Sequence, residues 1–288
     1  MFQKLIRNYM RILSKYAITI LNLIVFGPFA NADSLAVSVS SQCVAAPKRQ
    51  MTAASPITLP IKLLSWNIQK TENDGWQEDL TRYSNDSSLV LLQEANDTAP
   101  LSDALLQFSQ ASLAPGYHTG KMQTGVMTTA KQAALHHCFL QHREPWLRSF
   151  KTVQLSWYAL SNQQRLLVVN IHSVNFTFGT KDYQQQIQAF RKIAESHQGP
   201  MIIAGDFNTW NVSRLAKLDD STEQLGLAPV TFNADVRKRF FGNPLDHIYI
   251  RGLKVDTSST EASSSSDHNP LFAELSVHNT TLTQAVKN

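Results

Sequence analysis

Polar side chains follow directly after several apolar, strand-like runs of this 288-residue chain. Residues 201–206 read M-I-I-A-G-D, so Asp206 comes at the carboxyl end of the run, and Asn208 follows it by two. Because side chains alternate along extended backbone, Asp206 and Asn208 point the same way. The carboxylate can hold a water molecule or a hard cation, and the amide can donate to a phosphate oxygen. A plain Asx turn that closes a core strand has the same sequence pattern, so this run alone does not establish a site.

The same arrangement recurs along the chain, and its repetition favours a site. The polar residues at strand ends are Asn67, Glu94, His172, Asn175, Asp206, Asn208, Asp246, Asp267 and His268. Unrelated capping residues would not include all the parts of one reaction, whereas this set does. We therefore expect these side chains to converge at one edge of a sheet, where ligands bind in open α/β folds.

The set contains the ligands of a divalent cation. Glu94, Asp267 and the amide of Asn67 supply the oxygen atoms that Mg²⁺ prefers, and they leave positions for water and phosphate. A cation there would neutralise charge that develops on a phosphoryl oxygen or on the leaving group. The sequence thus predicts a metal site with Mg²⁺ or Mn²⁺ as cofactor.

The remaining members of the set suit hydrolysis. We expect His268 to be the general base for an attacking water, with Asp246 fixing its tautomer and orientation. We expect His172 and Asn208 to donate to the phosphoryl oxygens, and Asp206 to orient or deprotonate the water. The hypothesis requires His268 to lie within about 10 Å of Asp206, the reach of a solvent relay.

Apolar periodicity predicts an α/β fold that begins near residue 59. We expect strands near residues 61–68, 89–92, 124–129, 150–160, 166–171, 201–206, 245–250 and 271–277. We expect helices over residues 100–108, 181–197 and 213–218, and a Ser-rich loop over 257–266. The run His136-His137-Cys138 up to His142 is interpreted as a strand with surface, because the spacing of its histidines matches no usual zinc pattern.

The order of these motifs resembles the endonuclease/exonuclease/phosphatase superfamily, which includes DNase I-like nucleases, apurinic endonucleases, bacterial sphingomyelinases and inositol polyphosphate 5-phosphatases. The motifs are W-N at 66–67, L-L-Q-E at 91–94, V-N-I-H at 169–172, G-D-F-N at 205–208, L-D at 245–246 and S-D-H-N-P-L at 266–271. The resemblance implies a four-layer α/β/β/α sandwich of two mixed sheets flanked by helices. It also implies Mg²⁺- or Mn²⁺-dependent hydrolysis of phosphate esters.

The resemblance extends to single residues. Asn67 and Glu94 match metal-site positions, Asp267 matches a further acid close to the metal, and Asp246 matches the acid that orients the histidine. Asp206, Asn208 and His268 match the catalytic core. His172 is a histidine in the DNase I-like and sphingomyelinase-like branches, and Asn175 resembles a phosphate-contacting asparagine. His247 departs from the family, which usually has an aromatic or apolar residue there.

The positive charge of the chain is concentrated at its start. Four of the 26 basic residues (Lys4, Arg7, Arg11 and Lys15) precede Asp33, and the rest balance the 22 acidic residues. The basic pI is therefore no evidence for a polyanionic partner.

The four basic residues at the start of the chain are followed by an apolar run over 17–30 and by Ala30-Asn31-Ala32. This pattern predicts a signal peptide over 1–32 and export to the periplasm. An uncleaved N-terminal anchor and a cytoplasmic protein with an unused signal are the alternatives, and we expect no membrane span after cleavage.

The rest of the chain is expected to form a flexible linker over 33–59, one domain over 60–278 and a tail over 279–288. We expect a monomer. The two cysteines, Cys43 and Cys138, exclude a disulfide scaffold. We favour unpaired thiols and leave a bridge between them open.

The leading functional hypothesis is a phosphodiesterase that acts on DNA or RNA. The alternative is a hydrolase of a phospholipid, sphingomyelin or an inositol phosphate, and a binding protein on the same scaffold is a third possibility. Arg237, Lys238 and Arg239, beside Phe240-Phe241, are candidates for substrate binding or else a solvated loop. A basic groove would favour the nuclease, and an exposed apolar loop would favour the lipid hydrolase.

Overall fold

A computed structural model describes residues 38–39, 43, 55–108, 110–145, 147, 149–177 and 179–277. The predicted signal peptide and C-terminal tail lie outside these residues, as does most of the predicted linker. Within the described ranges, every helix is too short or too polar to cross a bilayer.

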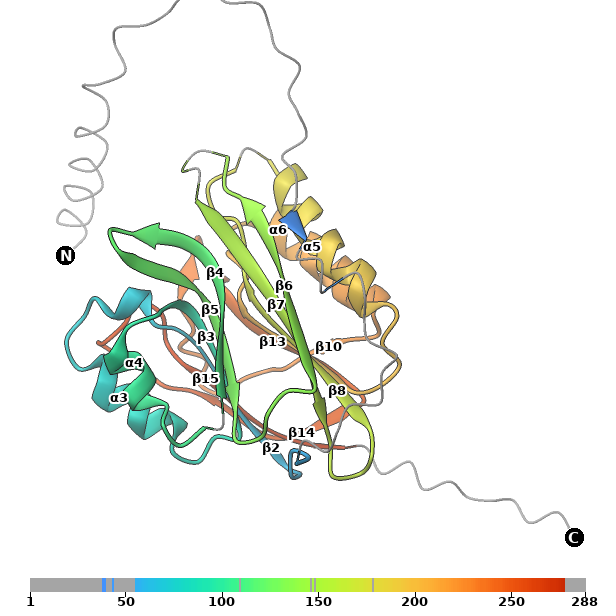
Figure 1. The fold of residues 1–288 in the computed structure, drawn as a ribbon. Coiled ribbons are helices and arrows are strands. Elements are labelled where there is room, and N and C mark those ends of the chain that lie inside the picture. Colours follow the sequence, from blue (N-terminus) through green and yellow to red (C-terminus); the bar gives the residue numbers. More distant parts are fainter. Residues whose placement is uncertain are drawn as a thin grey trace, which may run out of the picture. The chain divides into compact units, whose positions relative to one another are not determined.

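A seven-stranded mixed sheet forms one half of the domain (Figure 1). Its order is β1 (Ser38–Val39), β6 (His136–Arg143), β7 (Phe150–Ala159), β8 (Arg165–His172), β9 (Met201–Asp206), β13 (Asp246–Arg251) and β10 (Ala228–Pro229). Strands β8 and β9 run parallel, and the other pairs are antiparallel. The parallel pair brings the carboxyl ends of β8 and β9 to one edge, as the sequence predicts.

A six-stranded mixed sheet forms the other half. Its order is β14 (Leu253–Thr260), β15 (Leu271–Val277), β2 (Ile61–Asn67), β3 (Leu89–Asn96), β5 (Met122–Ala130) and β4 (Gln110–Thr119). Here β2 and β3 are the parallel pair. A separate two-stranded hairpin, β11 (Arg239–Phe240) with β12 (Asn243–Pro244), precedes β13.

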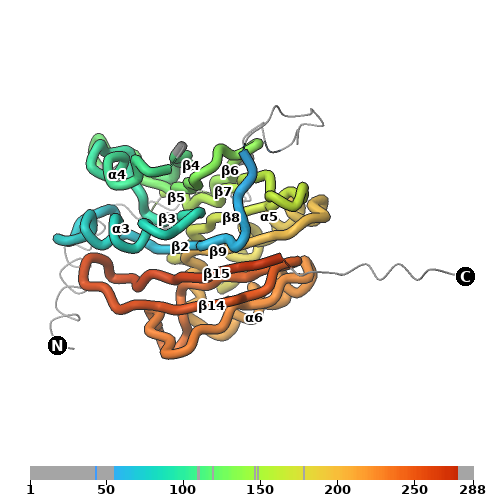
Figure 2. The backbone as a smooth tube through the Cα atoms, turned by 90° about the horizontal axis from the view of Figure 1, so that it is seen from below, coloured from blue at the N-terminus to red at the C-terminus, as the bar shows by residue number. Residues whose placement is uncertain are grey.

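The two sheets pack face to face, and helices cover their outer faces (Figures 1 and 2). The central strands are apolar on both faces because both faces are buried. Leu63 of β2 packs in the core between the sheets, and its neighbour Leu64 packs in the outer core with helix α3 (Trp76–Ser84) and helix α4 (Ala99–Ala104).

The outer face of the seven-stranded sheet is covered in the same way. Val169 and Ile203 of β8 and β9 pack against helix α5 (Lys181–Ala194) and helix α6 (Val212–Gln224). The result is the four-layer α/β/β/α sandwich that the sequence predicts.

The structure differs from the sequence prediction at several elements. Helix α4 ends at Ala104 instead of 108, α5 ends at Ala194, and α6 continues to Gln224. Helix α3 and strand β4 were not predicted. The first part of the predicted Ser-rich loop belongs to β14, since Ser and Thr are tolerated on an edge strand that faces solvent.

The expectation of unpaired thiols was wrong. Cys43 and Cys138 form a disulfide across 95 residues of sequence. The bond ties a residue of the predicted linker to β6, and both cysteines are buried in the core next to α5.

Candidate active site

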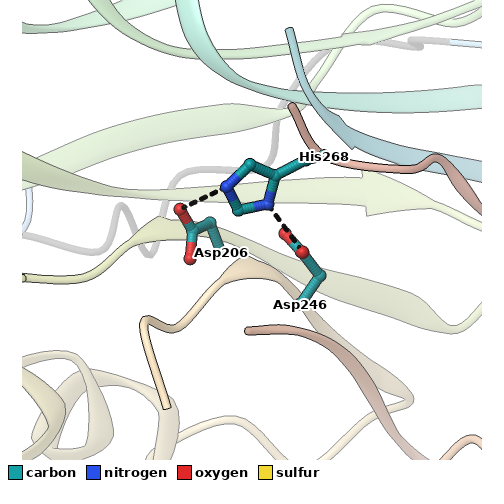
Figure 3. A group of neighbouring side chains, drawn as sticks. All are labelled: Asp206, Asp246 and His268. Carbon is teal, nitrogen blue, oxygen red and sulfur yellow. Dashed lines mark hydrogen bonds and ion pairs between the residues drawn. The ribbon is translucent and has the colours of Figure 1, made fainter. Parts of the chain in front are cut away.

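Three adjacent strands of the seven-stranded sheet place acidic and imidazole side chains in one row. His172 of β8 is the register partner of Asp206 of β9, and Asp206 is the register partner of Asp246 of β13. His268 reaches this row from the loop before β15, in the other sheet (Figure 3). The sequence-predicted residues therefore converge, although they come from both sheets.

His268 lies between the two aspartates of this row. Its Nδ1 is 2.7 Å from Asp246 Oδ2, and its Nε2 is 3.8 Å from Asp206 Oδ2 (Figure 3). The second distance is well within the 10 Å that the hypothesis requires. All three side chains are buried, so the group is shielded from bulk water. We refer to Asp246, His268 and Asp206 as the relay.

The turn that carries His268 is fixed to β2. Trp66 Nε1 donates to the His268 carbonyl at 3.0 Å, and Ser266 Oγ donates to the Asn67 carbonyl at 2.6 Å. The His268 amide in turn donates to Ser266 Oγ at 3.1 Å. Two residues of the W-N motif thus anchor the S-D-H motif, which explains why both are needed at the site.

The close approach of β8 to β9 within the seven-stranded sheet requires Gly205 ahead of Asp206. A Cβ atom at Gly205 would lie 2.1 Å from the Ile171 carbonyl oxygen, so any larger residue would displace the strand. Asn208 has a positive φ of 49° just beyond the strand, and its backbone N–H donates to Asp206 Oδ1 at 2.9 Å. The G-D-F-N motif therefore fixes the position of the Asp206 carboxylate.

Left-handed backbone surrounds the predicted metal ligands. Glu94 has a φ of 51° at a β-bulge between Gln93 and Ala95, and the turn over 69–71, η1 (Gln69–Thr71), holds three consecutive non-glycine residues at positive φ. Such conformations are costly and gather at functional sites. The turn places Lys70 Nζ 3.1 Å from Glu94 Oε2.

The donor set fits a hard divalent cation. Glu94 and the Asn67 amide lie at the ends of adjacent parallel strands, and Asn67 Nδ2 donates to Asp206 Oδ2 at 3.1 Å. The relay also offers one ligand atom from each residue within 4.8 Å of one another. Carboxylate and amide oxygens of this kind match Mg²⁺ or Mn²⁺. Asp267 is exposed, and its amide donates to Gln69 Oε1, so its role as a ligand stays a prediction.

The relay shifts the pKa values of its members. Burial disfavours the charged form of His268, but the carboxylates of Asp246 and Asp206 outweigh it and raise the pKa of His268 to about 10. Burial also raises the pKa of Asp206, although the charge of His268 opposes this shift. Neighbouring titratable groups with displaced pKa values are typical of acid–base sites.

The predicted metal ligand Glu94 stays ionised. Burial disfavours its charged form, but the charge that His172 carries at acidic pH and the charges of Lys151 and Lys70 outweigh it and lower the pKa of Glu94 to about 2. Burial, together with Lys151, lowers the pKa of His172 to about 4. His172 is therefore neutral at pH 7.

The predicted phosphate donors lie at the site with some of their hydrogen bonds already made. His172 Nε2 is 3.5 Å from Asp206 Oδ2 and 2.7 Å from Lys151 Nζ, and Asn208 Nδ2 donates to the Ser173 carbonyl. The side-chain amide of Asn175 makes no hydrogen bond to any residue that the structure describes. Contact of these groups with phosphate stays a prediction.

The basic triplet shares one acidic partner within the protein. Arg237 and Arg239 both pair with Asp235, at 2.7 and 2.6 Å, and Arg237 also donates to the Asp246 carbonyl. Lys238 makes no ion pair within the described ranges. Phe240 and Phe241 are 50% and 81% exposed. Substrate binding by the triplet stays a prediction, and the structure also gives Arg237 a place in holding Asp246.

Sequence reasoning missed several residues that build the site. Lys151, the one charged residue of β7, carries a signal that could have been used, and Lys70 carries none. Arg214 is fully buried and donates to the carbonyls of Val174, Asn175 and Asn208. It thereby fixes the loop after β8 relative to the end of β9.

A second missed feature joins the two sheets. Gln93 Nε2 donates to Asn170 Oδ1 at 2.7 Å, and Asn170 Nδ2 donates to the Leu92 and Met127 carbonyls. These buried amides connect β8 to β3 and β5 directly beneath Glu94 and His172. We refer to Gln93 and Asn170 as the amide bridge.

Comparison with known proteins agrees with this geometry. A sequence model of the endonuclease/exonuclease/phosphatase family matches residues 64–268, which is well over half of the chain. The chain belongs to this family. Members of the endonuclease/exonuclease/phosphatase family include nucleases, phosphatases and phosphodiesterases, which are hydrolases of phosphate esters.

Similar proteins include bacterial relatives and proteins of known structure. A UPF0294 protein of Erwinia tasmaniensis is 41% identical over 219 residues, which cover 76% of this chain and 82% of the relative. An endonuclease/exonuclease/phosphatase from Beutenbergia cavernae has a TM-score of 0.62 at 12% identity, covering 75% of this chain and 71% of that one. The structure of D. rerio TDP2 complexed with a single-strand DNA product has a TM-score of 0.54 at 15% identity, covering 76% and 100%. These structural likenesses show the fold.

Proposed function

We propose that this chain is a divalent-metal-dependent phosphodiesterase. The observation that carries the proposal is the relay, with His268 held 2.7 Å from Asp246 and 3.8 Å from Asp206 beside the ionised Glu94. The family fold supplies the coarser assignment to phosphate ester hydrolysis. The relay makes this chain's own residues sufficient for general acid–base chemistry.

Glu94 and Asn67 would hold the cation, with Asp267 as a further acid. A bound Mg²⁺ or Mn²⁺ supplies charge neutralisation at a phosphoryl oxygen or at the leaving group. The Lys70 ammonium, 3.1 Å from Glu94, balances the same carboxylate from the other side.

The relay handles the proton of the attacking water. Asp206 Oδ2 and His268 Nε2 lie close enough for one water to hydrogen bond to both. The raised pKa of His268 keeps the imidazole protonated at neutral pH, so we propose that the proton passes to the carboxylate of Asp206 while His268 stabilises the pair. Asp246 keeps the imidazole oriented and balances its charge. Asn175 and Asn208 supply amide donors for the phosphoryl oxygens.

Nucleic acid is the substrate class that we propose first. Phe240 and Phe241 stand on the hairpin that leads into Asp246, and exposed aromatic rings can stack on unpaired bases. Lys238 lies on the same segment for contact with a phosphate chain. The fold shared with TDP2 in complex with single-strand DNA supports this choice.

A phospholipid headgroup is the second candidate. The exposed Phe240–Phe241 pair is the apolar loop that this alternative predicts, and Asp235 engages both arginines of the basic triplet. A membrane surface accommodates exposed aromatic side chains beside a site that cleaves a headgroup.

A substrate panel separates the two candidates. The purified protein with Mn²⁺ is assayed on nicked plasmid, single-stranded RNA, sphingomyelin vesicles and inositol phosphates, each with and without EDTA. We expect metal-dependent cleavage of nucleic acid and none of the lipid. Cleavage of sphingomyelin alone would favour the second candidate, and hydrolysis of no phosphate ester would contradict the proposed function.

We also propose that the protein is exported. The charged and apolar start of the sequence and the Cys43–Cys138 disulfide support this, since disulfides persist in oxidising compartments. We expect protein recovered from the periplasm to begin at Asp33. Recovery from the cytosol with Met1 intact would contradict it.

A further inference from the structure

Lys151 is a buried lysine that stands inside the site. It belongs to β7, next to β8 in the seven-stranded sheet, and its residue surface is only 9% exposed. Its Nζ is 2.7 Å from His172 Nε2. A lysine is seldom buried without a partner, because removing an ammonium from water is costly.

The direction of this hydrogen bond is fixed by chemistry. An ammonium has three N–H donors and no acceptor, so Lys151 donates and His172 Nε2 accepts. Nε2 therefore carries no proton and cannot donate to a substrate oxygen from this arrangement. The cationic donor in this part of the site is Lys151, and His172 holds it in place.

Lys151 has donors to spare. No carboxylate lies within 4.0 Å of its Nζ among the residues that the structure describes, and His172 takes one of its three N–H groups. The nearest acids stand around the same His172 nitrogen, with Nε2 3.5 Å from Asp206 Oδ2 and 3.8 Å from Glu94 Oε1, beyond direct contact with the ammonium. Two N–H groups of a buried cation are thus left for a ligand.

The surroundings of Lys151 identify the ligand as an anion. The amide of Asn175 lies on the loop that continues from His172, and Asn208 stands at the end of the next strand. These groups and the lysine can all donate, and Asp206, which we propose to contact the attacking water together with His268, lies 3.5 Å from His172. A tetrahedral anion with several acceptor oxygens satisfies such a group of donors.

We propose that Lys151 binds a non-bridging oxygen of the substrate phosphate, and that His172 is the positioning residue that holds its ammonium. The inference rests on the proposed phosphodiesterase function, because it assigns the contact by which that site holds its phosphate. It adds a cation from the start of β7 to a site otherwise built from the ends of other strands and from loops.

A structural role for Lys151 predicts a different behaviour on substitution. A buried lysine that stabilises the fold would lower the unfolding temperature when it is replaced. A buried lysine kept for ligand binding is a cost to the free protein, so an apolar residue of similar length leaves the unfolding temperature unchanged or raises it. Weaker phosphate binding without a lower unfolding temperature is therefore expected only if the inference is right.

The experiment uses the full chain with Lys151→Met, Lys151→Arg and the control Lys254→Met, which removes an exposed lysine at the remote end of β14. We measure the unfolding temperature, the affinity for inorganic phosphate by calorimetry, and kcat and KM for bis(p-nitrophenyl) phosphate with Mn²⁺. For Lys151→Met we expect phosphate binding about tenfold weaker, kcat/KM about 100-fold lower and no fall in unfolding temperature. Lys151→Arg should recover part of the affinity, and Lys254→Met should match the wild type.

Each outcome decides the inference. Wild-type phosphate affinity and turnover in Lys151→Met would overturn it, as would a loss that comes with a lower unfolding temperature, or a wild type that does not bind phosphate. If the wild type binds phosphate through Lys151 but hydrolyses no diester, the proposed function fails and the lysine assignment stands. If the wild type hydrolyses the diester and Lys151→Met is unchanged, the lysine assignment fails alone.

Discussion

The two sheets contribute different kinds of backbone to one site. On the six-stranded sheet, Asn67 leads into a left-handed turn and Glu94 stands in a bulge. On the seven-stranded sheet, His172, Asp206 and Asp246 are regular register partners in adjacent strands. Irregular backbone aims a few oxygen atoms at a ligand, and a regular row holds groups at the fixed spacing that proton transfer needs. The difference suggests a division of work between cation binding and acid–base chemistry.

The largest effect should follow from breaking the relay on the seven-stranded side. For His268→Ala we expect kcat to fall by about 10²- to 10⁴-fold, because the imidazole between Asp206 and Asp246 is removed. Binding of Mn²⁺, measured by calorimetry, should weaken much less than turnover, because Glu94 and Asn67 remain. Asp256→Asn, on β14, serves as the control. Equal losses of turnover and Mn²⁺ affinity would contradict the division of work.

The converse substitution tests the six-stranded side. For Glu94→Gln we expect Mn²⁺ affinity to weaken by more than about tenfold, because a charged ligand becomes neutral. Turnover at low Mn²⁺ should fall by orders of magnitude and should recover in part when Mn²⁺ is raised.

Removal of the metal from the wild-type protein is a separate test. Excess EDTA should abolish the wild-type reaction. Undiminished turnover in EDTA would refute metal-dependent chemistry.

The disulfide should affect stability without affecting chemistry. Cys43→Ser with Cys138→Ser removes a link across 95 residues at the edge of the seven-stranded sheet. We expect the free energy of unfolding to fall by about 2–4 kcal/mol, measured by denaturant titration, with kcat unchanged. A fall in kcat at a temperature where the variant is fully folded would mean that this edge influences the relay.

The smallest effect concerns the segment that leads to Asp246. Hydrogen bonds from Arg237 hold the pKa of Asp235 at about 2, below its ordinary value of 3.8. The stability that this shift contributes is fully present above the unfolded pKa and is lost as pH falls toward 2. We expect the stability difference between wild type and Asp235→Asn, from urea unfolding, to be constant above pH 5 and to shrink between about pH 4 and pH 2. A difference that persists at pH 2 would contradict this assignment.

How far the sequence predicts the molecule depends on whether a feature has a local signal. Apolar runs that end in Asp206, Glu94 or His172 record both a buried strand and its position at the sheet edge, so the fold and the converging residues were predictable. Strand β4 was missed because Pro115 and Gly116 argue against a strand, yet an edge strand with a bulge tolerates them.

Features that arise from tertiary contact left no such signal. Lys70 reaches Glu94 only through three left-handed residues that no propensity predicts, and Cys43 lies far in sequence from its partner Cys138. Lys151 is the instructive case between these extremes. A single lysine in a strand that is buried along most of its length was visible in the sequence, but its contact with His172 follows from the pairing of β7 with β8.

The amide bridge has a consequence for how a substrate arrives. Gln93 and Asn170 join the inner faces of the two sheets by hydrogen bonds immediately below the site. Separating the sheets would leave several buried amide and carbonyl groups without a hydrogen-bond partner. The floor of the site is thus rigid. Entry and departure must proceed through the loops above it, which makes their sequences, rather than the sheets, the place where relatives of this chain can change what they recognise.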